Sequence, residues 1–124
     1  MDLLRSVNLI YLASPYSKYP FGLHTAFVDV CFLAGRLIEH GLKVYSPIAH
    51  THPIALYNHM DPLDHLVWLP FDEAIMRACD LLLIAEMEGW KESYGIGEEI
   101  KVFAKADKPI MRINPATLKV TANV

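Results

Sequence analysis

A short stretch near residue 95 combines the residue types that handle oxygen and charge at the start of a helix. It reads Ser93-Tyr94-Gly95-Ile96-Gly97-Glu98-Glu99-Ile100 and follows the apolar run Leu81–Ala85. A hydroxyl and two glycines there leave backbone N–H groups open to an oxygen ligand, and the helix dipole favours an anion. Glu98 and Glu99 are neighbours and therefore point to different faces of the helix. One carboxylate can face a bound molecule, although first-turn acids also complement the dipole without doing chemistry.

Hydroxyl groups also surround the end of the first predicted strand. That strand covers residues 7–13, contains Tyr11, and is followed by Ser14 and Ser17. Because the carboxyl ends of parallel strands meet at one edge of a sheet, we expect these serines near Ser93, where they could bind a phosphate. Taken singly, each serine is more often a turn or cap residue. Tyr11 is either a core aromatic or a hydroxyl that orients a carboxylate.

Further candidates lie between these stretches. Asp72 is near a predicted helix start and is either an N-cap or a hydrogen-bond partner of a base or leaving group. His50 follows the second strand and is the best histidine for contact with substrate. Trp90 and Tyr19 lie on predicted loops, where they suit stacking on a ring or simple loop packing.

Four histidines raise the question of a metal site: His50, His52, His59 and His65. No cysteine cluster and no His-Glu-x-x-His helix accompanies them, so we expect no metal. The chain also lacks a Walker-type phosphate loop and a Gly-x-Gly-x-x-Gly turn, and we expect no cofactor.

Composition excludes several classes of partner. The chain has 124 residues, which suits a single domain over 1–124, and a net charge of −3 without a basic block. Binding to a nucleic-acid polymer needs clustered Lys and Arg, so no such partner is expected. Cys31 and Cys79 lie in apolar patterns typical of buried thiols in a reducing compartment. No secretory signal or apolar run of roughly 18 residues occurs, so we expect a cytoplasmic protein without a membrane partner.

The periodicity predicts alternating strands and helices. Strands are expected over 7–13, 42–45, 80–87 and 109–113, and helices over 23–40, 63–79 (broken near Pro70) and 95–106. Residues 48–60 are expected as a loop with at most one helical turn, and Asp61-Pro62 as the start of the next helix. The N-terminus is expected to run straight into the first strand, and the tail from 114 to fold back or join a partner. This order predicts a Rossmann- or flavodoxin-like α/β domain whose parallel sheet has about four to five strands and helices on both faces.

Together, these residues resemble the nucleoside 2-deoxyribosyltransferase superfamily. The resemblance is strongest to its short phage and bacterial members and to nucleoside-5′-monophosphate N-glycosidases, and it covers about residues 7–113. Three stretches carry it: Ile10-Tyr11-Leu12-Ala13-Ser14-Pro15-Tyr16-Ser17, then Asp72 ahead of Ala78-Cys79-Asp80-Leu81-Leu82, and Ser93-x-Gly95-x-x-x-Glu99-Ile100.

The resemblance implies roles for particular residues. Glu99 matches the glutamate that attacks the anomeric carbon, and Tyr11 the tyrosine that holds that carboxylate. Asp72 matches the aspartate near the nucleobase or sugar. Positions that bind the 5′-phosphate in the monophosphate hydrolases are matched by Ser14 or Ser17, and by Ser93.

Two departures leave the substrate open. Ile100-Lys101 follows the glutamate where many members have Leu-Gly, and the first-loop arginine of the monophosphate hydrolases is absent, with Lys18 the only nearby cation. The resemblance thus implies cleavage or 2-deoxyribosyl transfer on a nucleoside or its 5′-monophosphate.

Two other functions and an assembly remain as expectations. A non-catalytic nucleotide-binding or sensing module on the same fold is the main alternative. A flavin- or nicotinamide-linked redox domain is disfavoured by the missing glycine-rich turn. The resemblance also suggests a homodimer or larger homo-oligomer in which a neighbour closes the pocket, with residues 53–68 and the tail as the suspected surfaces.

Overall fold

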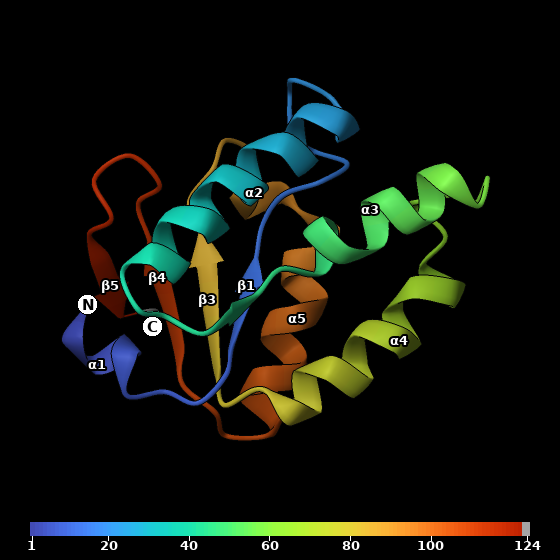
Figure 1. The fold of residues 1–124 in the computed structure, drawn as a ribbon. Coiled ribbons are helices and arrows are strands. Elements are labelled where there is room, and N and C mark those ends of the chain that lie inside the picture. Colours follow the sequence, from blue (N-terminus) through green and yellow to red (C-terminus); the bar gives the residue numbers. More distant parts are fainter. Residues whose placement is uncertain (123–124) are drawn as a thin grey trace.

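The computed structural model describes residues 1–122 and contains one five-stranded sheet in the order β2-β1-β3-β4-β5 (Figure 1). The strands are β1 (Ile10–Ala13), β2 (Val44–Tyr45), β3 (Leu81–Ala85), β4 (Ile110–Ile113) and β5 (Val120–Ala122). Neighbouring strands from β2 to β4 are parallel, and β5 runs antiparallel to β4. The predicted α/β class with a parallel sheet of four to five strands is confirmed, with the edge strand β5 as the one antiparallel member among the described residues.

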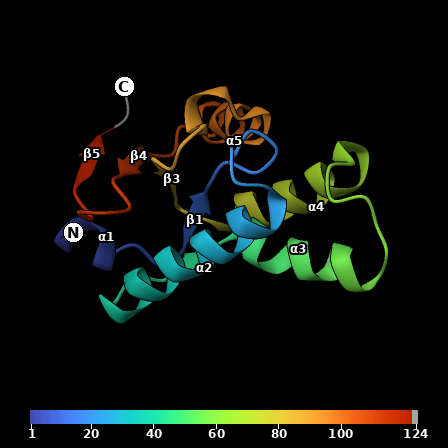
Figure 2. The same ribbon diagram turned by 90° about the horizontal axis from the view of Figure 1, so that it is seen from above.

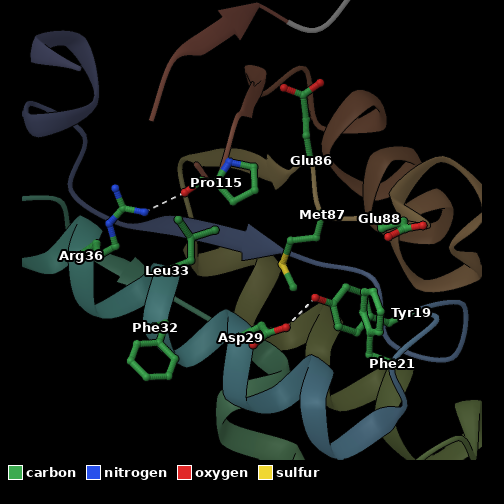
Figure 3. A pocket seen from close by; sticks show the side chains of 10 residues that line it. All are labelled: Tyr19, Phe21, Asp29, Phe32, Leu33, Arg36, Glu86, Met87, Glu88 and Pro115. Carbon is green, nitrogen blue, oxygen red and sulfur yellow. Dashed lines mark hydrogen bonds between the residues drawn. The ribbon is translucent and has the colours of Figure 1, made fainter. Parts of the chain in front are cut away.

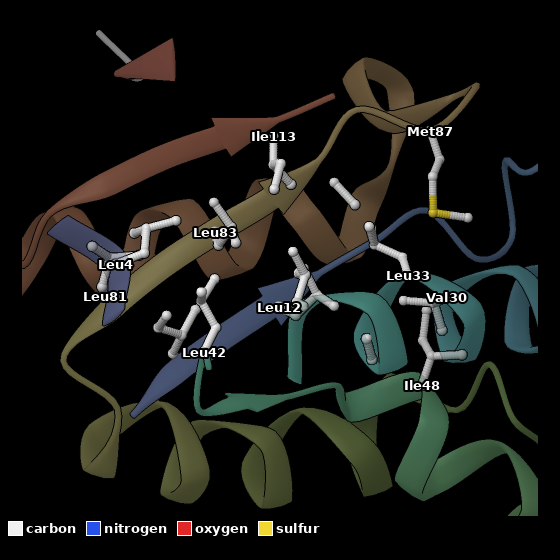
Figure 4. Packing of buried hydrophobic residues seen from close by; sticks show 14 residues of the cluster. Leu4, Leu12, Val30, Leu33, Leu42, Ile48, Leu81, Leu83, Met87 and Ile113 are labelled. Carbon is white, nitrogen blue, oxygen red and sulfur yellow. The ribbon is translucent and has the colours of Figure 1, made fainter. Parts of the chain in front are cut away.

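The central strands are buried on both faces, and successive side chains alternate between two hydrophobic clusters. Leu12 and Leu83 pack in the cluster under helix α2 (Leu23–Glu39), as Figure 4 shows. Tyr11 and Leu82 join the opposite cluster, against α4 (His65–Ala78) and α5 (Tyr94–Lys105). Seen from above, α2 and α5 lie on opposite sides of the sheet (Figure 2). The sheet is therefore a fixed base for the loops at its carboxyl edge.

The two helices with the clearest spacing formed as predicted. Helix α2 ends at Glu39 and is followed by Gly41 at a φ of 88°, the left-handed region that favours glycine. Helix α5 begins after Ser93 and runs to Lys105, within a residue or so of the predicted range.

The prediction of a loop over residues 48–60 is wrong, because helix α3 spans Pro47–Tyr57. Its N-cap is Ser46, whose hydroxyl accepts a hydrogen bond from the Ala49 amide at 3.1 Å, and its first residue is a proline. Pro53 inside the helix removes one amide donor and, with the neighbouring histidines, hides the helical spacing. The buried residues of α3 are Pro47, Ile48, His52 and Ala55.

The predicted helix start at Asp61-Pro62 is also wrong. Helix α4 begins at His65, and its N-cap is Asp64, which accepts a hydrogen bond from the Leu66 amide at 3.2 Å. Asp61 makes the same kind of contact one turn earlier, accepting from the Leu63 amide at 2.9 Å. Asp61 therefore stabilises a turn through the same side-chain-to-amide hydrogen bond that an N-cap makes, and this turn precedes the actual N-cap of α4.

Helix α4 is not broken at Pro70. The helix runs through this proline to Ala78. Pro70 has no amide to donate to the carbonyl of Leu66, so the helix lacks one internal hydrogen bond there and yet continues.

Both ends of the described range, residues 1–122, pack against or join the sheet. The N-terminus forms a short helix, α1 (Asp2–Arg5), with Leu4 buried, so the expectation that it runs straight into a strand is wrong. The tail folds back as β5, while Asn123 and Val124 lie outside the described residues. Among residues 1–122, no helix has the length and apolar character needed to cross a membrane.

Candidate functional site

A cavity of about 90 Å³ lies beyond the end of β1, next to the first turn of α5. Its wall comes from the loop after β1, from α3, from the α3–α4 connection with α4, and from the start of α5. These parts contribute Ser14, Tyr16 and Ser17; Pro47, Ile48 and Thr51; Pro62, Leu63, His65, Trp68 and Asp72; and Ser93, Gly95 and Glu99. The cavity thus brings together six residues singled out from the sequence: Ser14, Ser17, Asp72, Ser93, Gly95 and Glu99.

The start of α5 presents Glu99 to this cavity. Ser93 caps the helix, and its hydroxyl accepts a hydrogen bond from the Ile96 amide at 3.2 Å. Glu99 lies on the buried face and is only 7% exposed. Glu98 lies on another face and pairs with Lys101 at 3.5 Å. The two adjacent carboxylates therefore diverge as expected, and Glu99 is the one at the cavity.

The surroundings of Glu99 favour its protonated form. Burial raises the pKa of this carboxyl to about 8, the nearby Tyr11 phenol opposes the rise, and the negative charge of Asp72 adds to it. Burial likewise raises the pKa of Asp72 to about 6. Two carboxyls with raised pKa values in one cavity are typical of a catalytic or ligand-binding site.

Tyr11 lies behind the cavity on β1, fully buried between the rings of Tyr45 and Phe103. Its hydroxyl is near enough to Glu99 to affect the pKa of that carboxyl, yet it makes no hydrogen bond of standard geometry in the described residues. Burial, followed by the charges of Glu99 and Asp72, raises the pKa of Tyr11, which therefore stays a neutral phenol. A neutral phenol can donate to the Glu99 carboxylate once that group ionises.

Other buried polar atoms near Tyr11 also lack a partner in the described residues. They are the Ser14 hydroxyl, one carboxyl oxygen of Asp72 and the Tyr45 hydroxyl. Asp72 lies inside α4, so its alternative assignment as an N-cap is wrong. Buried polar atoms are nearly always paired in folded proteins, and a group of unpaired ones points to a place where a polar ligand binds.

Residues 8–114 match the family described as "Domain of unknown function (DUF1937)". The chain belongs to the DUF1937 family. The matched range contains the cavity and every residue predicted for the site. No curated protein matches the sequence.

In the DUF1937 domain, three residues that the sequence predicted for substrate binding do not line the cavity. His50 is exposed on α3 and stacks on Phe71 of α4, with ring centroids 5.7 Å apart. Trp90 lies in the short helix η1 (Trp90–Glu92) and packs under the Arg112 guanidinium at 5.7 Å. Gly97 is exposed on α5, with open space where a side chain would extend.

Sequence reasoning assigned no role in the site to Tyr16, Thr51 and Trp68, all of which line the cavity. Thr51 belongs to α3, the helix hidden by its internal proline. The available signal was the Ser46-Pro47 pair, a cap followed by proline at the first helical position. Trp68 is fixed by its indole N–H, which donates to the Asp61 carbonyl at 2.9 Å across the α3–α4 connection.

A second hollow, of about 480 Å³, lies between α2 and the loop after β3 (Figure 3). Tyr19, a predicted stacking residue, points into this hollow and donates a hydrogen bond to Asp29 at 2.5 Å. Tyr19 does not line the Glu99 cavity. Within residues 1–122, no group of three or more His, Cys, Asp or Glu side chains is placed to hold a metal ion.

Proposed function

We propose that this DUF1937 protein acts on the N-glycosidic bond of a (deoxy)nucleoside or nucleoside 5′-monophosphate, by hydrolysis or 2-deoxyribosyl transfer, through a covalent bond to Glu99. The observation that carries the proposal is the buried Glu99 carboxyl with its raised pKa, beside unpartnered polar atoms of Tyr11, Ser14 and Asp72. The resemblance to the nucleoside 2-deoxyribosyltransferase superfamily involves the same residues and supports the same chemistry.

The proposed reaction has two displacement steps. The ionised Glu99 carboxylate attacks C1′ of the sugar, the C1′–N bond breaks, and its electron pair stays on the base nitrogen, which takes up a proton. Water then attacks C1′, loses a proton and releases the sugar, or the nitrogen of a second base attacks instead. Tyr11 donates to the carboxylate that is re-formed. Asp72 hydrogen-bonds the base or a sugar hydroxyl.

The charges around the cavity favour a neutral nucleoside over a phosphate ester. Among the described residues that line it, none is Lys or Arg, and two are the carboxyls of Asp72 and Glu99. A phosphate dianion would meet these two acids without a side-chain cation to offset the repulsion. Lys18 is on the same loop as Ser14 and Ser17 but does not line the cavity.

The cavity is small for such a ligand. A volume of about 90 Å³ holds only a few water molecules, each of which occupies about 30 Å³ in the liquid. A whole nucleoside would therefore extend from the cavity toward solvent, or would displace the α3–α4 connection, which carries Pro62 and Leu63.

The test is base release measured by HPLC from a panel of ribo- and deoxynucleosides and their 5′-monophosphates. Wild type should release base, and Glu99→Gln should reduce the rate by at least about 10³-fold. Glu98→Gln is the matched control, because its side chain is next in sequence but faces Lys101. Full activity in Glu99→Gln would refute the mechanism. Saturable binding without release from any substrate would favour the nucleotide-sensing alternative. Addition of a second free base separates transfer from hydrolysis.

We also propose a homodimer or larger assembly in which a neighbour covers the cavity. Exposed apolar side chains gather on α3 and α4 beside it, including Tyr57, Leu66 and Val67. Such groups are typical of protein interfaces. Light scattering should give a mass above that of one chain, and Leu66→Lys should lower it. A monomeric wild type would contradict this part of the proposal.

A further inference from the structure

A hydrogen-bonded row of three side chains connects the cavity wall with the surface. The Tyr16 hydroxyl lies 2.5 Å from Nδ1 of His52, and Nε2 of His52 lies 3.3 Å from Nδ1 of His24. Tyr16 lines the cavity beside Glu99, whereas His24 is exposed on α2. The row joins residues that are far apart in sequence, from the loop after β1, from α3 and from α2.

The middle residue of the row is held firmly. His52 is 8% exposed, and its ring stacks on Phe27 with centroids 4.7 Å apart and an interplanar angle of 21°. The Tyr16 ring packs edge-on against the His52 imidazole, with the two ring centroids 5.7 Å apart. The two ring nitrogens of His52 therefore face Tyr16 and His24, one each.

The titration behaviour of the row suits proton transfer. Burial raises the pKa of Tyr16 to about 12, so its hydroxyl keeps its proton near neutral pH. Burial, and then the charge of His24, lower the pKa of His52, which favours the neutral imidazole with one N–H and one acceptor nitrogen. The titratable groups around His52 are Tyr16 and His24 in the row, and His59, which lines the hollow outside it.

We propose that Tyr16, His52 and His24 form a relay that delivers a solvent proton to the nucleobase as it leaves, an inference that rests on the proposed function. As the C1′–N bond breaks, its electron pair on the base nitrogen takes the Tyr16 hydroxyl proton. The Tyr16 oxygen takes the proton from His52 Nδ1, and His52 Nε2 takes one from His24 Nδ1. His24 Nε2 is reprotonated by solvent. One proton enters and one leaves, and no residue changes its charge, but both imidazoles end in the opposite tautomer. In the second step the proton lost by the attacking water passes to the Tyr16 oxygen and back along the row to solvent, which restores the starting tautomers. Tyr16 is the catalytic member of the row, and the histidines act through it.

The test compares two substrates with different leaving groups. A deoxynucleoside loses a base that must be protonated, whereas 4-nitrophenyl 2-deoxyriboside loses a phenolate that needs no proton. Tyr16→Phe and His52→Gln should lower kcat for the deoxynucleoside at least about tenfold and leave the aryl substrate nearly unchanged. His24→Ala should have a smaller effect of the same kind, and because His24 is exposed this variant should fold normally. His59→Asn is the control, since His59 makes no hydrogen bond to the row and its φ of 54° suits asparagine.

Each outcome bears on a different claim. A wild type inactive on both substrates means that the proposed function fails, and the relay with it. If wild type is active and the variants lose activity toward both substrates equally, the row is only structural and the relay is wrong. Unchanged deoxynucleoside turnover in Tyr16→Phe and His24→Ala also overturns it. A loss of activity confined to the deoxynucleoside supports the relay. Glu99→Gln, by contrast, should lose activity toward both substrates.

Discussion

At the scale of single residues, the buried Glu99 carboxyl sets the expected pH dependence. Its pKa is raised to about 8 by burial, so most copies are protonated at pH 6. Attack on the sugar needs the carboxylate, so kcat/KM should rise with pH and level off above about 8. A pH profile of base release from a deoxynucleoside measures this directly. A flat profile from pH 5 to 9 would contradict the assignment of Glu99 as nucleophile.

Two neighbours should move this titration in opposite directions. The charge of Asp72 raises the pKa of Glu99, whereas the Tyr11 phenol lowers it. Asp72→Asn should therefore lower the pKa of Glu99, and Tyr11→Phe should raise it. Carboxyl ¹³C NMR of protein labelled at glutamate measures both shifts without any substrate. Shifts of the same sign in both variants would show that these side chains do not act on Glu99 as described.

At the scale of elements, Gly89 lets the loop after β3 lie directly against the loop after β1. It precedes η1 at a φ of +89°, and a Cβ added there would lie 2.5 Å from the Lys18 carbonyl oxygen in the loop after β1. Gly89→Ala should destabilise the protein by about 1–3 kcal/mol, since it combines backbone strain with a clash. Gly35→Ala, inside α2 with open space around it, should instead stabilise by about 0.5–1 kcal/mol. Urea unfolding of both variants should give opposite signs, and a loss of stability in both would contradict this account.

Sequence signals differed in how well they located elements. Helices α2 and α5 were predictable because regular apolar spacing coincided with a C′ glycine in one and a serine cap in the other. Helix α3 was not predictable, because Pro53 and the histidines hid its apolar spacing, although Ser46 as N-cap and Pro47 as first residue marked its start. Since α3 supplies Ile48 and Thr51 to the cavity, the missed helix also concealed one of its walls.

At the scale of the whole molecule, stability should fall as pH rises. The folded state raises the pKa of Glu99 from 4.5 to about 8 and that of Asp72 from 3.8 to about 6. Between each pair of values the folded state holds more protons than the unfolded one, so the free energy of unfolding decreases with pH. The loss begins near pH 4 and ends near pH 8. Glu99→Gln should be more stable than wild type by about 2 kcal/mol or more at pH 9, with little gain at pH 4. Denaturant unfolding at the two pH values decides this, and an equal difference at both would contradict the linkage.

The fold and the site were predictable to different degrees. Alternating apolar strands and helices indicated the parallel sheet, and the rule that strand ends share an edge placed Ser14, Ser17 and Ser93 near one another. What the sequence could not show is which polar atoms stay unpaired, since that depends on side-chain directions in the packed core. The Tyr16–His52 contact likewise links positions 36 residues apart, with no local pattern to indicate it.

Trp68 places an intrinsic fluorophore in the cavity wall. The chain has two tryptophans, and the other, Trp90, packs against Arg112 away from the cavity. Trp90→Phe would leave Trp68 as the sole indole emitter. Its emission would respond to stacking of a nucleobase and to release of the indole N–H from the Asp61 carbonyl. Stopped-flow fluorescence could then follow ligand entry and displacement of the α3–α4 connection on the millisecond scale, separately from any chemical step.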